Sequence, residues 1–187
     1  MLDAETKRAI VDGRFEQSDE GVLVPETRTL IQGIVQYAKR GEPVEQTHNL
    51  IVNQGLNYLL EAATGGQSPI TTWYVAVFTG DVSVQSSWTA SNFASNATEF
   101  TQYEAGSRPS WSPGSVASGA RDSFSSKAEF KSTTDGAMIR GAALISSSTK
   151  GGTGGVLMGA TRFNNAKPLD EDEILDVGYG LQVTAVT

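Results

Sequence analysis

The stretch LDVGYGLQVTA at residues 175–185 decides the fold class of this 187-residue chain. Its large apolar and aromatic side chains fall on every second position, while aspartate, glycine, glutamine and threonine occupy the positions between them. Because successive side chains of a strand point to opposite faces, this alternation predicts a long antiparallel strand. One face of that strand is expected to be wet or thinly covered.

Several other segments also have the pattern of strands. The near-continuous apolar run TWYVAVF at 72–78 predicts a strand covered on both faces. Two more apolar runs, AMIRGAALI at 137–145 and VLMGATRF at 156–163, flank a serine- and glycine-rich turn. No strand–helix alternation indicates a parallel sheet. The chain is therefore predicted to be mainly β: an antiparallel β-sandwich or jelly-roll-like domain with one short helix, long loops and an N-terminal arm.

The one predicted helix covers residues 54–64. Asn53 is its predicted N-cap, and the pair Gly65-Gly66 can supply the left-handed residue that ends it. Its apolar residues have the spacing of a stripe that packs against the domain. The stripe consists of Leu56, Leu59, Leu60 and Ala63.

The rest of the domain organisation follows from composition. Residues 1–28 are polar and irregular apart from the short apolar cluster Val22, Leu23 and Val24, and they are predicted to form an N-terminal arm or an edge hairpin. Residues 29–187 are predicted to be the β-sandwich domain. Within it, residues 82–126 are rich in serine and alanine but contain six aromatic residues, which predicts long ordered loops anchored by aromatic side chains.

Composition also excludes several classes of function. A net charge of −7 argues against nonspecific nucleic-acid binding, which needs basic patches. The absence of cysteine excludes disulfides, thiol nucleophiles and cysteine-ligated metals. The charged N-terminus lacks the apolar core of a signal peptide, and no stretch approaches the roughly 18 apolar residues of a membrane helix. We therefore expect a soluble protein without nucleic-acid or membrane partners.

His48 is the only imidazole of the chain, so a Ser-His-acid site would have to use it. No G-x-S-x-G motif precedes a helix, however, and no carboxylate is tied to His48 by its spacing. The simpler interpretation is a polar residue at a strand end. No catalytic residue is predicted.

Two further stretches resemble ion or phosphate sites only superficially. The acidic run 170–173 could collect a hard cation, but it lacks the spaced ligands of a calcium loop and is better explained as a solvated turn beside an edge strand. The glycine-rich stretch 151–155 lacks the spacing of a phosphate-binding loop, since Lys150 precedes the glycines, and it is predicted to be a hairpin tip. No metal or cofactor is expected, although cation binding by the acidic run stays open.

A carboxylate-bearing loop gives the last chemical candidate. Glu99, Glu104 and Arg108 lie near Tyr103 and Trp111, and a pair of carboxylates beside aromatic rings would suit a glycosidase or carbohydrate-binding cleft. The alternative is that Arg108 pairs with a local carboxylate and fixes the loop. We favour this alternative, so Glu99, Tyr103, Arg108 and Trp111 are predicted to structure the loop of a non-enzymatic domain.

Six segments follow one another in a distinctive order: HNLIVNQGLNYLL, TTWYVAVFTGD, TEFTQYEAGSRPSW, KAEFKSTTDGAMIRGAALIS, GGVLMGATRF and LDEDEILDVGYGLQVTA. This succession, from about Gly33 to the C-terminus, resembles tailed-bacteriophage capsid decoration (cement) proteins. The resemblance implies a jelly-roll-like fold. It also implies scaffold positions at Asn49, Asn53, Gly55 and Leu56, and loop-structuring positions at Glu99, Tyr103, Arg108, Pro109 and Trp111.

The function implied by the resemblance is structural. Such a protein sits on the exterior of the phage head, after synthesis in the host cytoplasm, and staples neighbouring major capsid subunits. A homo-oligomer, dimer or trimer, would present one patch to several capsid subunits, and the arm cluster Val22, Leu23 and Val24 would contact the capsid. The alternative is a phage tail or receptor-binding module whose segment 82–126 contacts host surface glycan.

Overall fold

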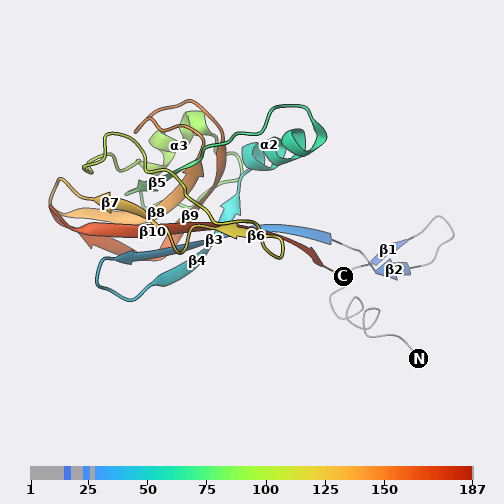
Figure 1. Cartoon of the computed structure of the whole chain (residues 1–187), viewed down its shortest axis with the longest axis horizontal. Coiled ribbons are helices and arrows are strands. Elements are labelled where there is room, and N and C mark those ends of the chain that lie inside the picture. Colours follow the sequence, from blue (N-terminus) through green and yellow to red (C-terminus); the bar gives the residue numbers. More distant parts are fainter. Residues whose placement is uncertain (1–14, 18–22, 26–27, 187) are drawn as a thin grey trace. The chain divides into compact units, whose positions relative to one another are not determined.

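A computed structural model describes residues 15–17, 23–25 and 28–186 of the chain (Figure 1). The chain divides into two compact units, Met1–Ile31 with Val183–Thr187 and Gln32–Gln182. Within the first unit, β1 (Phe15–Gln17) pairs with β2 (Leu23–Pro25) in an antiparallel hairpin. This hairpin lies in the stretch for which the sequence predicts an arm or an edge hairpin.

Most of the chain forms one antiparallel sheet of eight strands, in the order β5-β8-β9-β4-β3-β10-β6, with β7 also pairing with β10. The prediction of a mainly β, sandwich-like antiparallel fold is confirmed. Its strands are β3 (Arg28–Lys39), β4 (Glu45–Ile51), β5 (Tyr74–Phe78), β6 (Ala120–Asp122), β7 (Ala128–Lys131), β8 (Ala137–Ile145), β9 (Leu157–Leu169) and β10 (Ile174–Val186).

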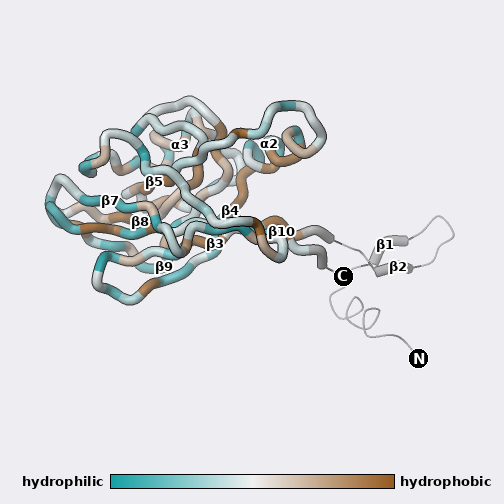
Figure 2. The backbone as a smooth tube through the Cα atoms, in the orientation of Figure 1, coloured by the Kyte–Doolittle hydropathy of each residue, from teal (hydrophilic) through white to brown (hydrophobic). Residues whose placement is uncertain are grey.

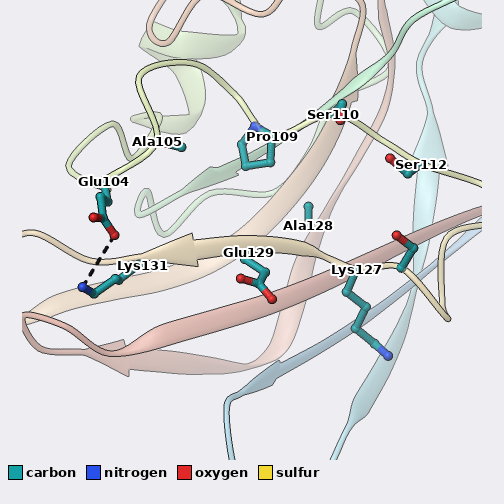
Figure 3. Close-up of a pocket in the computed structure, with 10 residues that line it drawn as sticks. Glu104, Ala105, Pro109, Ser110, Ser112, Lys127, Ala128, Glu129 and Lys131 are labelled. Carbon is teal, nitrogen blue, oxygen red and sulfur yellow. Dashed lines mark ion pairs between the residues drawn. The ribbon is translucent and has the colours of Figure 1, made fainter.

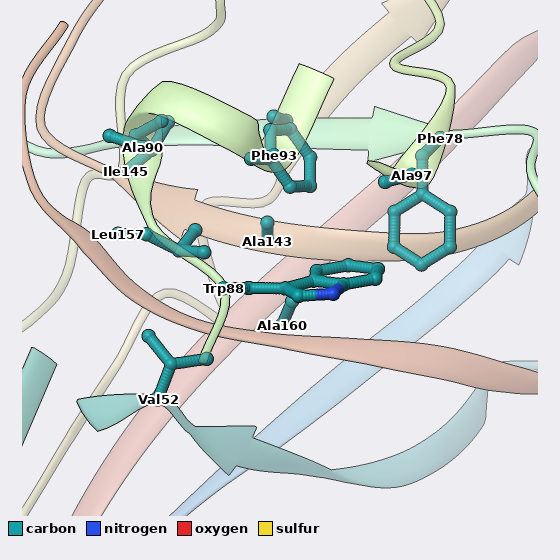
Figure 4. Close-up of a cluster of buried hydrophobic side chains, with 11 residues drawn as sticks. Val52, Phe78, Trp88, Ala90, Phe93, Ala97, Ala143, Ile145, Leu157 and Ala160 are labelled. Carbon is teal, nitrogen blue, oxygen red and sulfur yellow. The ribbon is translucent and has the colours of Figure 1, made fainter. Parts of the chain in front are cut away.

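Strand β5 is buried on both faces, as its unbroken apolar run predicts. Val75 and Val77 point to one side and Ala76 and Phe78 to the other, and all four are fully buried. Figure 4 shows the cluster on the second side, between strands β5, β8 and β9 and the residues that cover them. Its members are Val52, Ala76, Phe78, Trp88, Ala90, Phe93, Ala97, Ala143, Ile145, Leu157 and Ala160.

The element that closes this cluster is α3 (Ala90–Ala97). A reciprocal capping box fixes its start, with the Thr89 N–H donating to the Asn92 side-chain oxygen at 2.8 Å. Phe93 points inward and is fully buried. The helix lies in the region for which the sequence predicts only loops, so the described residues contain two helices where the pattern predicts one.

The predicted helix at 54–64 is confirmed as α2 (Asn53–Thr64), and Gly65 ends it with a φ of 80°. The predicted N-cap is wrong. Val52 occupies that position, and its apolar side chain makes no cap bond. The Asn53 N–H at the start of the helix donates to the Ser86 carbonyl at 2.9 Å. A long-range main-chain contact thus satisfies a backbone N–H at the helix start, where the sequence predicts a local side-chain cap.

The predicted packing stripe of α2 is also wrong. Leu56 is 39% exposed and Leu60 66% exposed, whereas the buried residues are Gly55 and Tyr58. Gly55 packs directly on the Met158 carbonyl, where any Cβ would collide. The helix therefore approaches β9 through its smallest residue, which leaves Leu56, Leu60 and Ala63 exposed and Leu59 half-buried. Figure 2 shows hydrophobic residues both along the strands and on α2.

Candidate functional site

The segment 98–111 links strands from the two ends of the sheet. The Phe100 N–H donates to the Val77 carbonyl of β5 at 2.8 Å, and four residues later the Glu104 N–H donates to the Lys131 carbonyl of β7 at 2.9 Å. The segment thus covers the outer edge of β5 and caps one end of β7. It forms the wall of the candidate site.

A buried ion pair holds this segment. The Arg108 guanidinium donates to both carboxylate oxygens of Glu99 at 2.7 Å, and the two side chains are 0% and 1% exposed. Arg108 also donates to the carbonyls of Ser147 and Gly152, at 2.9 and 3.3 Å. Glu99 in turn accepts the N–H of Gly151 at 3.1 Å. The pair joins segment 98–111 to the glycine-rich tip between β8 and β9.

The role of this ion pair is to stabilise the structure. A fully buried bidentate pair directs its charges at each other and at main-chain groups, which leaves neither side chain open to a substrate. Removing one partner of such a pair costs about 3–5 kcal/mol, because the remaining charge stays buried. Of the four predicted loop-structuring residues, the structure brings Glu99 and Arg108 into direct contact.

Lys150 and Tyr103 make a second attachment between the same segments. The Lys150 ammonium donates to the carbonyls of Thr101 and Tyr103, at 3.2 and 2.7 Å, and lies 3.8 Å from the centre of the Tyr103 ring. Burial lowers the pKa of Lys150. Burial, with the charge of Glu99 adding to it, raises the pKa of Tyr103, so this phenol stays neutral.

Trp111 lies apart from these groups. Its indole N–H donates to the Tyr179 carbonyl at 2.8 Å, and its backbone N–H donates to the Trp73 carbonyl at 2.7 Å. The Arg121 guanidinium lies 5.7 Å from the centre of its ring. Trp111 therefore attaches the end of the segment to β10 and to the residue before β5, and does not join the Arg108 cluster.

A surface hollow of about 500 Å³ opens between segment 104–112 and β7 (Figure 3). Its charged groups are engaged within the protein. The Lys131 ammonium lies 3.5 Å from a carboxylate oxygen of Glu104 and 2.9 Å from one of Asp172, and Glu129 pairs with Arg40 at 2.5 Å. The hollow is lined by Glu104, Ala105, Pro109, Ser110, Ser112, Ser126, Lys127, Ala128, Glu129 and Lys131.

His48 is exposed on β4, opposite Ile34 of β3. Its carbonyl accepts the Thr161 hydroxyl at 2.7 Å. In the described part of the chain, the imidazole has no hydrogen-bond or ion-pair partner. No nucleophile or orienting carboxylate is therefore placed beside it there.

The acidic run 170–173 forms the turn between β9 and β10. Glu173 accepts the Asp170 N–H at 2.9 Å and pairs with Lys39, and both contacts lower the pKa of Glu173, the hydrogen bond being the larger cause. Asp172 pairs with Lys131. Among the residues that the structure describes, no group of three or more acidic or histidine side chains is placed to hold a metal ion.

The remaining predicted positions are spread over the molecule. Asn49 donates from its side chain to the Tyr179 hydroxyl, and the Pro109 carbonyl accepts the Val75 N–H at 2.9 Å. Of the arm cluster, Val22 lies outside the described residues, and Leu23 and Val24 are described only as backbone in β2. Their contact with a capsid stays a prediction.

Two residues with central structural roles escaped sequence reasoning. In the sequence, Lys150 only showed that the glycine-rich stretch lacks the spacing of a phosphate-binding loop. A lysine beside glycines does not indicate that its ammonium packs on the distant Tyr103 ring. The Gln54 side-chain oxygen accepts the N–H groups of Ala90 and Leu157, both at 2.8 Å. It thereby joins the starts of α2, α3 and β9. No spacing in the sequence indicates these long-range contacts.

Comparison with models of protein families and with curated proteins gave no match. Among the described residues, no helix has the length and apolar character needed to cross a membrane.

Proposed function

We propose that this chain is a structural virion protein that decorates the outside of a bacteriophage head and staples neighbouring major capsid subunits. The observation that carries the proposal is the leucine face of α2, defined as Leu56 and Leu60. These side chains lie one helical turn apart and are 39% and 66% exposed. Exposed apolar side chains in a row suit a protein-binding surface.

The helix that carries the leucine face is firmly held. Gly55 packs against β9, Tyr58 packs edge-on against Trp73 with ring centres 5.2 Å apart, and the Tyr58 hydroxyl accepts the Ile70 N–H at 2.7 Å. A face held in this way loses little conformational freedom on binding. Fully burying one leucine contributes only about 1.5–3 kcal/mol. A decoration protein multiplies such modest contacts over many copies and over a dimer or trimer.

A non-enzymatic role agrees with the loop chemistry. A sugar-cleaving site in this loop would need Glu99 and Glu104 as its two carboxylates, yet Glu99 is buried and bonded to Arg108. The net charge of −7 suits an exterior position better than contact with packaged DNA. The proposed location on the phage head and the proposed partner, the major capsid protein, come from the sequence resemblance.

The alternative role, a tail or receptor-binding module that contacts glycan, has less support. Sugar binding would need exposed aromatic faces in segment 82–126. Four of its six aromatic residues, Trp88, Phe93, Phe100 and Tyr103, are instead 5% exposed or less, because they anchor the segment to the sheet. Trp111 and Phe124 are partly exposed, but the Trp111 indole N–H is already bonded to the Tyr179 carbonyl.

The proposal is tested by co-sedimentation with expanded empty capsids assembled from the major capsid protein of the same genome. We expect saturable binding, reduced at least tenfold in the double variant Leu56→Gln/Leu60→Gln. The matched control is Val116→Gln, a change at a 68% exposed apolar residue outside α2, which should bind like the unchanged protein. Absence of binding by the unchanged protein, or equal loss in both variants, would contradict the proposal.

A further inference from the structure

We propose that the hollow beside β7 is an acceptor slot for one extended peptide segment of another protein. The slot is the gap between β7 and residues 109–112 (Figure 3). The inference rests on the direction of backbone groups on its two walls. It does not depend on the proposed role in a virion.

The first wall is the free edge of β7. The Ser132 N–H donates to the Glu173 carbonyl at 2.9 Å, and the register pairs Glu129 with Asp176. In an antiparallel ladder alternate residues bond to the neighbouring strand, so the N–H and C=O of Glu129 and Lys131 point away from β10. The Lys131 carbonyl is capped by the Glu104 N–H. The backbone groups of Glu129 face the slot.

The second wall is the segment that covers β5. The Val75 N–H donates to the Pro109 carbonyl at 2.9 Å, and the Trp111 N–H donates to the Trp73 carbonyl at 2.7 Å. These bonds flank the pairing of Ser110 with Tyr74, so the N–H and C=O of Ser110 point away from β5, toward the slot. Both walls therefore offer unpaired main-chain groups to a strand placed between them.

The two walls determine the kind of occupant. A β7 edge from a second copy carries its own residues 109–112 in front of it, so two such edges cannot meet. A single extended segment can enter, as in other cases of strand addition to a sheet. Its inward side chains would meet the small residues Ala105 and Ala128, which line the slot.

Charge narrows the occupant further. Glu129 is neutralised by Arg40, and Lys131 by Asp172 and Glu104. Lys127 donates to the Phe124 carbonyl at 2.7 Å, and its ammonium is directed away from residues 109–112 (Figure 3). The segment that fits is therefore extended and uncharged, with small or β-branched side chains facing inward.

The test uses the capped peptide Thr-Val-Thr-Val-Thr and its counterpart with proline at the centre, titrated into ¹⁵N-labelled full-length protein. We expect saturable shifts at the amides of Ser110 and Glu129, with the threonine peptide binding at least tenfold more tightly, because proline cannot donate a main-chain hydrogen bond to the walls. No saturable shift at these amides, or equal binding of the two peptides, would overturn the proposal.

A variant of the protein's own backbone tests strand addition from the other side of the contact. Glu129→Pro removes an N–H that the sheet itself does not use, and should reduce binding at least tenfold, whereas Glu129→Ala keeps the N–H and should retain binding. Should Glu129→Pro fail to fold, Ser110→Pro removes the corresponding donor from the other wall. Peptide binding at unchanged strength in a folded proline variant would also overturn the proposal.

Discussion

Helices α2 and α3 use their apolar residues in opposite ways. Helix α3, of eight residues, buries Phe93 completely against the sheet. Helix α2, of twelve residues, has leucines at the spacing of an apolar helix face but leaves Leu60 66% exposed. The difference shows that periodicity defines an apolar face without deciding which face is buried. At α2, close packing of Gly55 on β9 sets the orientation, and the leucines follow from it.

The largest effect should come from the core of α3. Phe93→Ala removes a fully buried ring that packs edge-on against Phe78 and Trp88, and should lower the free energy of unfolding by about 3–5 kcal/mol. Urea denaturation measures the change. Leu60→Ala, at an exposed position of α2, is the matched control, and a larger loss in the control would reverse the comparison.

Next in size is the contact that orients α2. Gly55→Ala places a Cβ against the Met158 carbonyl and should cost about 1–3 kcal/mol, since backbone atoms must move. Thermal unfolding gives the shift. Gly66→Ala serves as control because its Cβ would make only ordinary contacts with Glu61. If Gly55→Ala were as stable as Gly66→Ala, glycine packing would not explain the outward leucines.

The link between the helices should matter less. Gln54→Ala leaves the N–H groups of Ala90 and Leu157 without their acceptor, and should cost about 1 kcal/mol because water can reach this half-buried site. Gln54→Glu retains an acceptor oxygen and should recover most of that loss. Denaturation curves of the two variants that coincide would argue against the shared acceptor.

The smallest effect on stability is expected at the leucine face. Leu60→Gln should change the free energy of unfolding by no more than about 0.5 kcal/mol, because the side chain is already largely in water. The same substitution should weaken binding to capsids. A loss of more than about 1 kcal/mol, measured by urea denaturation, would mean that the leucine packs within the protein after all.

Strand patterns were the part of the fold that the sequence predicted well. Residues 73–78 form an unbroken apolar run because both faces of β5 are covered. In β10 the alternation marks the fully buried Leu175, Val177 and Tyr179, but Gly178 and Gly180 on the other face are buried as well, and Val183 is 47% exposed. The end of α2 at Gly65 was equally clear, because a left-handed residue favours glycine.

Helix α3 and the loop contacts were harder to predict for identifiable reasons. The sequence TASNFASNA of α3 and its cap contains few strong helix formers, and its capping box uses Asn92 instead of the usual glutamate or glutamine. The contacts of Lys150 and Gln54 join residues far apart in the chain. The choice of Glu99 as the partner of Arg108 required the fold, since Glu104 is closer in sequence.

The buried pair of Glu99 and Arg108 also has a consequence for how the domain opens. Detaching the glycine-rich tip between β8 and β9 would break the hydrogen bonds that Arg108 and Glu99 make with its main-chain groups. It would also expose the two charges or leave them buried without their partners. Local opening of this loop should therefore be nearly as costly as global unfolding. The amide protons of Arg108 and Gly151 should then exchange with solvent as slowly as those of the central strands, although they belong to surface connections.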